Sequence, residues 1–302
     1  MRLIRAISIV VVLLTTTACG DVNRALEQLS EARHLAANLH VQFLAAAGAT
    51  DRAVMADTDQ SSAAFAREAE QATQAAQRDI EALGPMLQGL KYADEARLLE
   101  TFVGQFNKYR ELDRQILDLA VQNTNLKAQQ LSFGPAQEAV DRFAGALDAI
   151  APRAATPDDG RLRGLAAAAL AAVREIQVLQ APHMADPSDT SMTNIERNMT
   201  ASEAEARAAL QALAATVPSA SRPKVAAASA ALDQFLAVNA QITSLSRQNT
   251  NVRSLALSLD QKRTLTAPCE ASLKALEEAL AKRAFPAGRW VPPEAAGDKG
   301  RQ

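Results

Sequence analysis

The sequence predicts an all-α protein made of two tandem antiparallel four-helix bundles in an elongated arrangement. Three observations lead to this prediction: the chain is rich in alanine, glycine and proline number only 12 each among 302 residues, and one segment recurs 126 residues later. Alanine has the highest intrinsic helix propensity, whereas glycine and proline interrupt helices. Runs of alternating β-branched residues, which would indicate strands, are essentially missing.

The charges nearly balance, with 32 Lys and Arg residues against 34 Asp and Glu residues. A protein that binds nucleic acid through its phosphates usually carries a basic patch or a basic excess. We therefore expect no nucleic-acid partner.

The N-terminus has the pattern of an export signal. Arg2 and Arg5 accompany an apolar stretch over residues 3–14, which is shorter than the roughly 20 residues that a membrane-spanning helix needs. A positive start followed by a short apolar stretch is typical of signal peptides. We therefore expect the chain to be exported and residues 1–18 to be removed.

Cys19 follows the small residues Thr16, Thr17 and Ala18, and this resembles the lipobox of bacterial lipoproteins, whose cysteine is lipidated and becomes the mature N-terminus. Thr16 stands where the motif usually has a large aliphatic residue, so ordinary signal-peptidase cleavage is the alternative. The lipobox predicts a membrane-anchored lipoprotein that faces the periplasm or the cell exterior. Cys269 would then be the only other thiol, so no disulfide is expected.

An internal repeat divides the remaining chain. Gln-Asn-Thr-Asn occurs at 122–125 and again at 248–251, and nine of eighteen positions are identical between the windows 115–132 and 241–258. Self-similarity at a fixed spacing indicates a duplicated unit. The prediction is a first bundle over 19–151 and a second over 160–284, with a linker at 151–160 and a disordered tail at 285–302.

Each module is predicted to contain four amphipathic helices, separated by polar or Gly- and Pro-containing segments. In the first module the helices are expected at 22–56, from the polar segment 57–62 to 83, from the turn 84–94 to 132, and from the break at 133–136 to 150. Pro135 suits the first turn of the fourth helix. In the second module the matching breaks are expected at 183–191, 217–223 and 265–269.

The repeated asparagines lie on the hydrophobic seam of the third helix of each module. At coiled-coil spacing, Asn123 and Asn249 fall between aliphatic residues, whereas Thr124 and Asn125 are expected to turn away from the seam. A buried amide needs hydrogen-bond partners or costs roughly 1–3 kcal/mol. Two interpretations compete: a polar pair that sets which helices associate, and amides that line a ligand cavity. Shared ancestry without a present role is a third.

The pattern of Asn125 or Asn251, then Lys127 or Arg253, then Leu-Ser, a break and a last amphipathic helix resembles the four-helix-bundle sensor domain of methyl-accepting chemotaxis receptors. The resemblance covers most of residues 25–282 and is similar to tandem versions of that domain. It implies binding of a small organic acid or amino acid through arginines and amides, and pairing as a homodimer. The candidate ligand-binding residues are Asn123, Asn125, Asn249, Asn251, Arg110 and Arg114.

The sequence contains no second apolar span, no following linker domain and no long signalling hairpin of the receptor type. We therefore expect any signal to pass to a separate membrane receptor or envelope protein. Arg33 and Arg52, like Arg110 and Arg114, could hold a carboxylate with two parallel hydrogen bonds. Solvated helix faces would have the same pattern.

Motifs for catalysis and for metals are sparse. Glu31 and His34 form a single Glu-x-x-His, whereas di-iron bundles need two. His183, Met184 and Met192 could form a soft-metal cluster, although a turn packed by methionine explains them as well. No haem-attachment, phosphate-loop or nucleophile-elbow motif is found. We expect no enzyme activity, no metal and no cofactor.

These observations predict a lipid-anchored, extracytoplasmic, sensor-like module that binds a small organic ligand or a membrane partner. The alternative is a structural envelope lipoprotein that acts as a helical spacer or adaptor.

Overall fold

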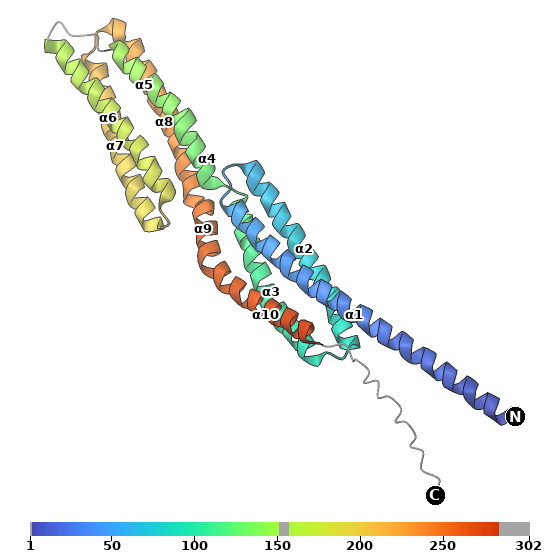
Figure 1. The fold of residues 1–302 in the computed structure, drawn as a ribbon. Coiled ribbons are helices and arrows are strands. Elements are labelled where there is room, and N and C mark those ends of the chain that lie inside the picture. Colours follow the sequence, from blue (N-terminus) through green and yellow to red (C-terminus); the bar gives the residue numbers. More distant parts are fainter. Residues whose placement is uncertain (1, 151–156, 284–302) are drawn as a thin grey trace. The chain divides into compact units, whose positions relative to one another are not determined.

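The computed structural model describes the backbone of residues 2–150 and 157–283, and the side chains of residues 24–150 and 159–283. Every regular element in these ranges is a helix (Figure 1), which confirms the all-α class. The side chain of Cys19 and the predicted tail at 285–302 lie outside the described residues. In the part that is described, no helix has the length and hydropathy to cross a membrane.

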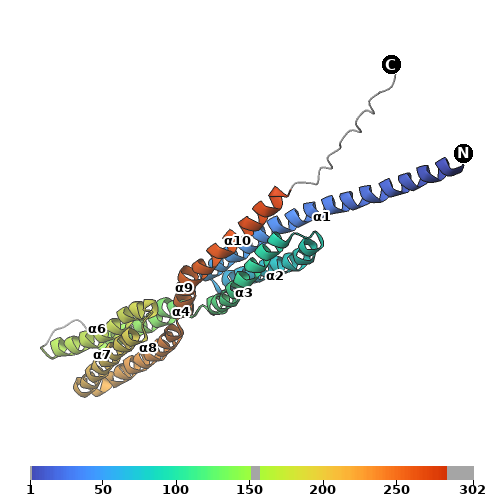
Figure 2. The same ribbon diagram turned by 90° about the horizontal axis from the view of Figure 1, so that it is seen from below.

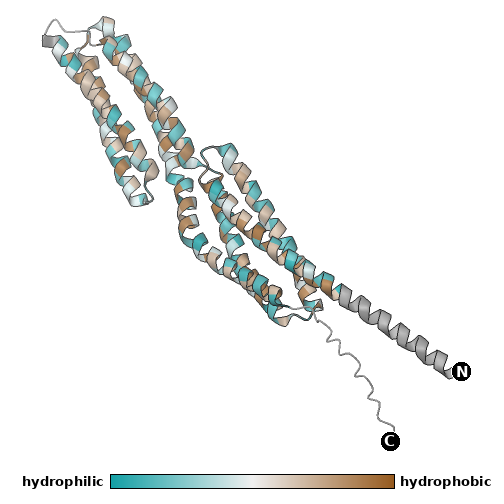
Figure 3. Ribbon diagram, viewed as in Figure 1, coloured by the Kyte–Doolittle hydropathy of each residue, from teal (hydrophilic) through white to brown (hydrophobic). Residues whose placement is uncertain are grey.

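The elements follow one another in the order in which they are labelled in Figure 1. They are α1 (Arg2–Val54), α2 (Asp59–Gly89), α3 (Ala93–Ala120), α4 (Thr124–Leu131), the π-helix η1 (Ser132–Ala136), α5 (Gln137–Ile150), α6 (Pro157–Ala185), α7 (Asp189–Thr216), the 3-10 helix η2 (Ser219–Ser221), α8 (Arg222–Gln248), α9 (Thr250–Leu257), the π-helix η3 (Ser258–Lys262) and α10 (Arg263–Lys282). Hydrophobic residues recur along the helices between hydrophilic ones (Figure 3), as expected for helices with one buried face.

The duplication extends to the secondary structure. Elements α4 and α9 begin 126 residues apart, as do η1 and η3, and the residue before each short helix is an asparagine with a positive φ. Pro135 lies inside η1 but Gln261 stands at the matching place in η3. The π turn therefore belongs to the repeated unit and does not depend on proline.

Two of the expected turns are confirmed, and four other expected boundaries are wrong. The turns at 183–191 and 217–223 separate α6 from α7 and α7 from α8. The third helix was expected to continue to 132, but it ends at Ala120 because Asn123 adopts a left-handed conformation. The helix α2 passes through Pro85 to Gly89. Neither 133–136 nor 265–269 ends a helix, because η1 and α10 accommodate Pro135 and Pro268.

The chain divides into two compact units. Unit 1 contains Met1–Ala46, Gln71–Lys108 and Leu265–Gln302, and unit 2 contains Ala47–Glu70 and Tyr109–Thr264. Unit 1 thus takes α10 from the second copy, and unit 2 takes α5 from the first. This grouping differs from the two self-contained modules predicted at 19–151 and 160–284. Relative to the order of the repeat, the fourth helices are therefore exchanged between the two units.

Unit 1 has a core of aromatic and aliphatic side chains, joined by polar contacts between its helices. The Phe43 ring of α1 meets the rings of Phe102 and Phe106 of α3 edge to face, at 5.9 and 6.1 Å between centroids. Helix α10 lies against α1 and α3 (Figure 2), where a His40 nitrogen is 3.0 Å from Glu277 and Ser272 donates to Gln105. These contacts hold the exchanged helix in place.

The C-terminal end of α10 is bound by two arginines. Arg33 donates to the carbonyl oxygens of Leu280, Ala281 and Arg283 at 3.1, 3.3 and 2.8 Å, which satisfies acceptors that a helix end leaves open. Arg283 in turn forms two hydrogen bonds to the buried carboxylate of Glu95, at 2.6 and 2.7 Å. These bonds lower the pKa of Glu95, against an opposing effect of burial.

Glu95→Gln is expected to lower the free energy of unfolding at neutral pH and to leave it nearly unchanged in acid. Because its pKa is lowered on folding, Glu95 contributes stability that is complete above its unfolded pKa of about 4.3 and is lost as pH falls through the lower folded value. Urea unfolding followed by circular dichroism should show a gap between wild type and Glu95→Gln that shrinks from neutral pH to about pH 3. The exposed Glu100→Gln is the control. A gap that does not change with pH would contradict this role.

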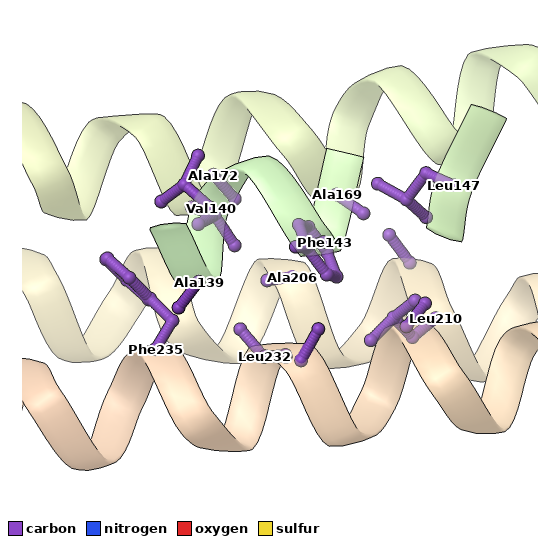
Figure 4. Packing of buried hydrophobic residues seen from close by; sticks show 14 of the residues in the cluster. Ala139, Val140, Phe143, Leu147, Ala169, Ala172, Ala206, Leu210, Leu232 and Phe235 are labelled. Atoms are coloured by element: carbon purple, nitrogen blue, oxygen red, sulfur yellow. The ribbon is translucent and has the colours of Figure 1, made fainter. Parts of the chain in front are cut away.

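Unit 2 contains a four-helix core formed by α5, α6, α7 and α8. Figure 4 shows this packing, with side chains from all four helices pointing toward one another. The labelled residues are Ala139, Val140, Phe143, Leu147, Ala169, Ala172, Ala206, Leu210, Leu232 and Phe235. Phe143 and Phe235 have no exposed surface, and full burial of such a ring stabilises the fold by about 2–3 kcal/mol. The alanines permit close approach of the helices.

Candidate functional site

The two copies of Asn-Thr-Asn meet in unit 2, where α3 passes into α4 and α8 passes into α9. Asn123 has φ 50° and Asn249 has φ 54°. Asparagine tolerates this left-handed region better than other non-glycine residues. Both side chains are buried, at 0% and 3% exposure, which confirms that the repeated asparagines lie in the interior. The left-handed residue redirects the chain at the start of each short helix.

Thr124 and Thr250 form the centre of this crossing. The hydroxyl of each accepts a hydrogen bond from the backbone N–H of the other, at 3.1 Å in both directions. The two hydroxyl oxygens are also 3.1 Å apart. The prediction that Thr124 turns away from the interior is therefore wrong, because this reciprocal bond is made only when the second copy is present.

Asn125 and Asn251 extend the same reciprocal pattern. The backbone N–H of Asn125 donates to Oδ1 of Asn251 at 3.1 Å, and the reverse bond is 3.2 Å. The Asn125 amide also donates to Oδ1 of Asn249 at 2.8 Å, and the Asn251 amide donates to Oδ1 of Asn123 at 2.9 Å. The prediction that Asn125 turns away is thus also wrong, and the four asparagines form one connected cluster.

The cluster is symmetric in sequence but not in all of its bonds. Nδ2 of Asn249 donates to the carbonyl oxygen of Asp186 at 2.8 Å, whereas Nδ2 of Asn123 is buried without a hydrogen-bond partner. Nδ2 of Asn125 has a further acceptor in the carbonyl oxygen of Met184, at 2.7 Å. The last turn of α6 and the residue after it therefore bind one side of the cluster.

A second, shorter repeat includes the residues at the end of α6 that bind the cluster. Met-Ala-Asp occurs at 55–57 and again at 184–186. In the second copy its Met and Asp carbonyl oxygens accept the bonds from Asn125 and Asn249. A search for short recurring segments would have found it, although its spacing of 129 residues differs from that of the main repeat.

A cavity of about 360 Å³ opens beside the cluster. Its lining is mostly apolar, with three amide side chains. The lining residues are Ala56, Asn125, Leu126, Gln129, Phe133, Ala181, Met184, Ala185 and Asn251. Phe133 lies on the π-helix η1 and is 73% exposed. From the sequence, Phe133 is expected only as part of a helix break, and no pattern singles out Gln129.

The predicted ligand-binding residues separate into three groups. Asn125 and Asn251 line the cavity. Asn123 and Asn249 lie behind them in the buried cluster. Arg110 and Arg114 are exposed and are not among the lining residues, and Arg114 is 3.5 Å from Glu111 on the same helix. The expected combination of arginine and amide at one site is not formed.

The other two arginines weighed as carboxylate ligands have intramolecular roles. Arg33 binds the carbonyl oxygens at the end of α10. Arg52 is 2.6 Å from a carboxylate oxygen of Glu68 and lies over the Phe65 ring at 4.8 Å.

A second polar contact differs in charge between the two copies. In one, Ser132 donates to Gln180 at 2.6 Å and Gln180 donates to Asn239 at 2.8 Å. The residues 126 positions from Asn239 and Ser132 are Asp113 and Ser258. The position that holds the neutral Asn239 in the second copy thus holds the ionisable Asp113 in the first.

The ionisable copy holds a buried lysine and a buried acid. Lys262 donates to Asp51 and to the carbonyl oxygen of Ala47, both at 2.6 Å. Ser258 also donates to Asp51, at 2.8 Å. Burial raises the pKa of Asp113, while hydrogen bonding to Thr50 and the charge of Lys262 oppose this shift. One oxygen of Asp113 is buried with no hydrogen-bond partner.

His183 belongs to a polar network at the end of α6. Its Nδ1 is 2.8 Å from the hydroxyl of Ser246, which donates to the His183 carbonyl oxygen, and its Nε2 is 2.9 Å from Glu196. Arg247 forms two bonds of 2.7 Å to Glu196 and lowers the pKa of that carboxyl. Ser246 is fully buried, so its hydroxyl is not accessible to a substrate, and the network joins α6, α7 and α8.

The soft-metal cluster weighed from the sequence is not assembled around His183, because both ring nitrogens face protein groups. Met192 is buried and Met184 lines the cavity. Among the described residues, no group of three or more His, Cys, Asp or Glu side chains could hold a metal ion. Cys269 is buried, and burial raises the pKa of its thiol to about 12.

Comparisons of this chain with protein-family models, with curated proteins and with solved structures found no match. The resemblance to chemoreceptor sensor domains therefore stays a prediction from the helix pattern.

Proposed function

We propose that this protein is a non-catalytic binding module of the cell envelope, exported and held at the membrane by a lipid on Cys19. It takes a small organic molecule into the cavity beside the Asn-Thr cluster. The observation that carries this proposal is the cavity of about 360 Å³, where Asn125, Asn251 and Gln129 converge on an apolar pocket.

The chemistry of the lining supports a ligand site. Small-molecule sites commonly have volumes of about 300–1,000 Å³ and combine apolar walls with a few placed polar groups. Phe133 offers an exposed aromatic ring on a π-helix, a local distortion that is frequent at functional sites. Covering such a ring with the apolar part of a ligand would stabilise the complex.

The site also has a route by which a ligand would affect the fold. Asn125 lines the cavity and bonds to Asn249 and to the Met184 carbonyl oxygen. A ligand seated there contacts both the crossing of the repeats and the turn after α6. Binding would stabilise this arrangement by an amount that grows with the logarithm of the ligand concentration divided by Kd. In the sensor-like interpretation, a separate membrane partner would recognise the ligand-bound form.

A thermal screen tests this function. The full-length protein in detergent is melted by circular dichroism with organic acids, amino acids and their neutral amides. At least one compound is expected to raise Tm in wild type and in Leu259→Ala, but not in Phe133→Ala. Leu259 is the matched control because it occupies the place of Phe133 in the other copy and is 62% exposed. If no compound raises Tm, or if Phe133→Ala responds like wild type, the proposal is wrong.

A structural adaptor is the second candidate, and one observation favours it. Most hydrogen bonds of the Asn-Thr cluster join residues of the cluster to one another. This is expected for polar residues that set which helices associate. An adaptor would be crosslinked to the same envelope protein in native membranes whether or not Phe133 is replaced, and no small molecule would change its Tm.

A further inference from the structure

The chemistry of the cavity narrows the ligand class beyond the proposed function, on which this inference rests. None of the described residues that line the cavity carries a charge. The polar lining groups are the amides of Asn125, Asn251 and Gln129. The resemblance to chemoreceptors implies an organic acid held by arginine, but Arg110 and Arg114 are not among the residues that line the cavity.

Hydrogen-bond donors are scarce at the base of the cavity. Both Nδ2 hydrogens of Asn125 are already committed, to the Met184 carbonyl oxygen and to Asn249 Oδ1. The backbone N–H groups of Asn125 and Asn251 donate to each other's side chains. Asn251 donates one Nδ2 hydrogen to Asn123. The donors that remain for a ligand are its second Nδ2 hydrogen and the Gln129 amide.

A carboxylate fits this set poorly. An ionised carboxylate accepts several hydrogen bonds, donates none, and loses its hydration when it enters an apolar pocket without a cation. A neutral amide or a similar group both donates and accepts, as the Gln129 side chain does. The side-chain Oδ1 atoms of Asn125 and Asn251 each accept one hydrogen bond from a backbone N–H and retain a second lone pair.

The apolar part of the ligand is expected to contact Phe133. This ring is exposed, although an aromatic side chain of its size is usually covered. Leu126 and Met184 complete the apolar surface, and methionine sulfur makes favourable contacts with aromatic rings. We infer that the cavity selects neutral amphipathic molecules, of which a small aromatic amide is the simplest, and discriminates against the corresponding carboxylates.

Benzamide and benzoate form a matched pair of probes, because they share a ring and differ in charge. Calorimetric titration of the full-length protein in detergent is expected to show benzamide binding at least about tenfold tighter than benzoate, a difference of about 1.4 kcal/mol. Phe133→Ala should weaken benzamide binding by at least about fivefold. Leu259→Ala should leave it unchanged.

If benzoate bound as tightly as benzamide, the cavity would not select neutral molecules. If Phe133→Ala abolished that benzoate binding, a ligand site at the cavity would still be supported. No binding of either probe at millimolar concentration would also overturn this inference. The proposed function itself fails only if the wider thermal screen finds no compound that depends on Phe133, so the two failures are distinguishable.

Discussion

Asn249→Ala is expected to lower the free energy of unfolding by about 3 kcal/mol, whereas Asn123→Ala should lower it by only about 1–2 kcal/mol. Both residues have nearly the same positive φ, so the strain of placing alanine there is shared. Asn249 accepts a bond from Asn125 and donates one to the Asp186 carbonyl oxygen. Asn123 accepts one bond from Asn251, and its Nδ2 is buried without a partner.

Urea unfolding followed by circular dichroism measures both variants, with the midpoint and the slope reported separately. Asn249→Gly is the control for backbone strain, because glycine adopts a positive φ freely but restores neither hydrogen bond. It should recover about 1 kcal/mol of the loss in Asn249→Ala. The asymmetry of the cluster would be refuted if Asn123→Ala cost as much as Asn249→Ala.

Asp113→Asn is expected to raise the free energy of unfolding at neutral pH, although it removes a charge next to a buried lysine. Burial raises the pKa of Asp113, so the folded state disfavours its ionised form. Such a group destabilises the fold increasingly as pH rises from the unfolded pKa up to the folded pKa. Asparagine avoids this cost, and Lys262 keeps its bond to Asp51.

The second copy supplies the matched control. Asn239 stands 126 residues after Asp113 and is neutral and 9% exposed, and it accepts a bond from Gln180. Asn239→Asp would bury a carboxylate there without a lysine, since Ala136 holds the place that corresponds to Lys262. We expect a loss of about 3 kcal/mol at neutral pH that diminishes in acid.

Unfolding free energies of the two variants, measured from about pH 4 to about pH 8, test this pair of expectations. As pH rises, the unfolding free energy of the wild type should fall relative to that of Asp113→Asn. A destabilised Asp113→Asn at neutral pH would mean that the attraction between Asp113 and Lys262 outweighs the cost of burial. An Asn239→Asp variant as stable as wild type would show that this interior tolerates a charge.

The candidate site was only partly predictable. The burial of Asn123 and Asn249 followed from their place on an apolar seam. The roles of Thr124 and Asn125 did not, because their partners lie 126 residues away and the seam continues only if the helix does. Phe133 of the π-helix η1 and Met184 in the last turn of α6 both line the cavity, and local periodicity does not reveal that they lie together.

The sequence alone determined the helical class, the duplication and some of the helix boundaries, since alanine content, polar breaks and apolar spacing act locally along the chain. Only the tertiary structure decided which helices share a core. Helices α5 and α10 follow the same motif, and each presents an apolar face of the same kind. Unit 2 contains α5 and unit 1 contains α10, and this choice depends on packing between residues far apart in the sequence, which no local pattern encodes.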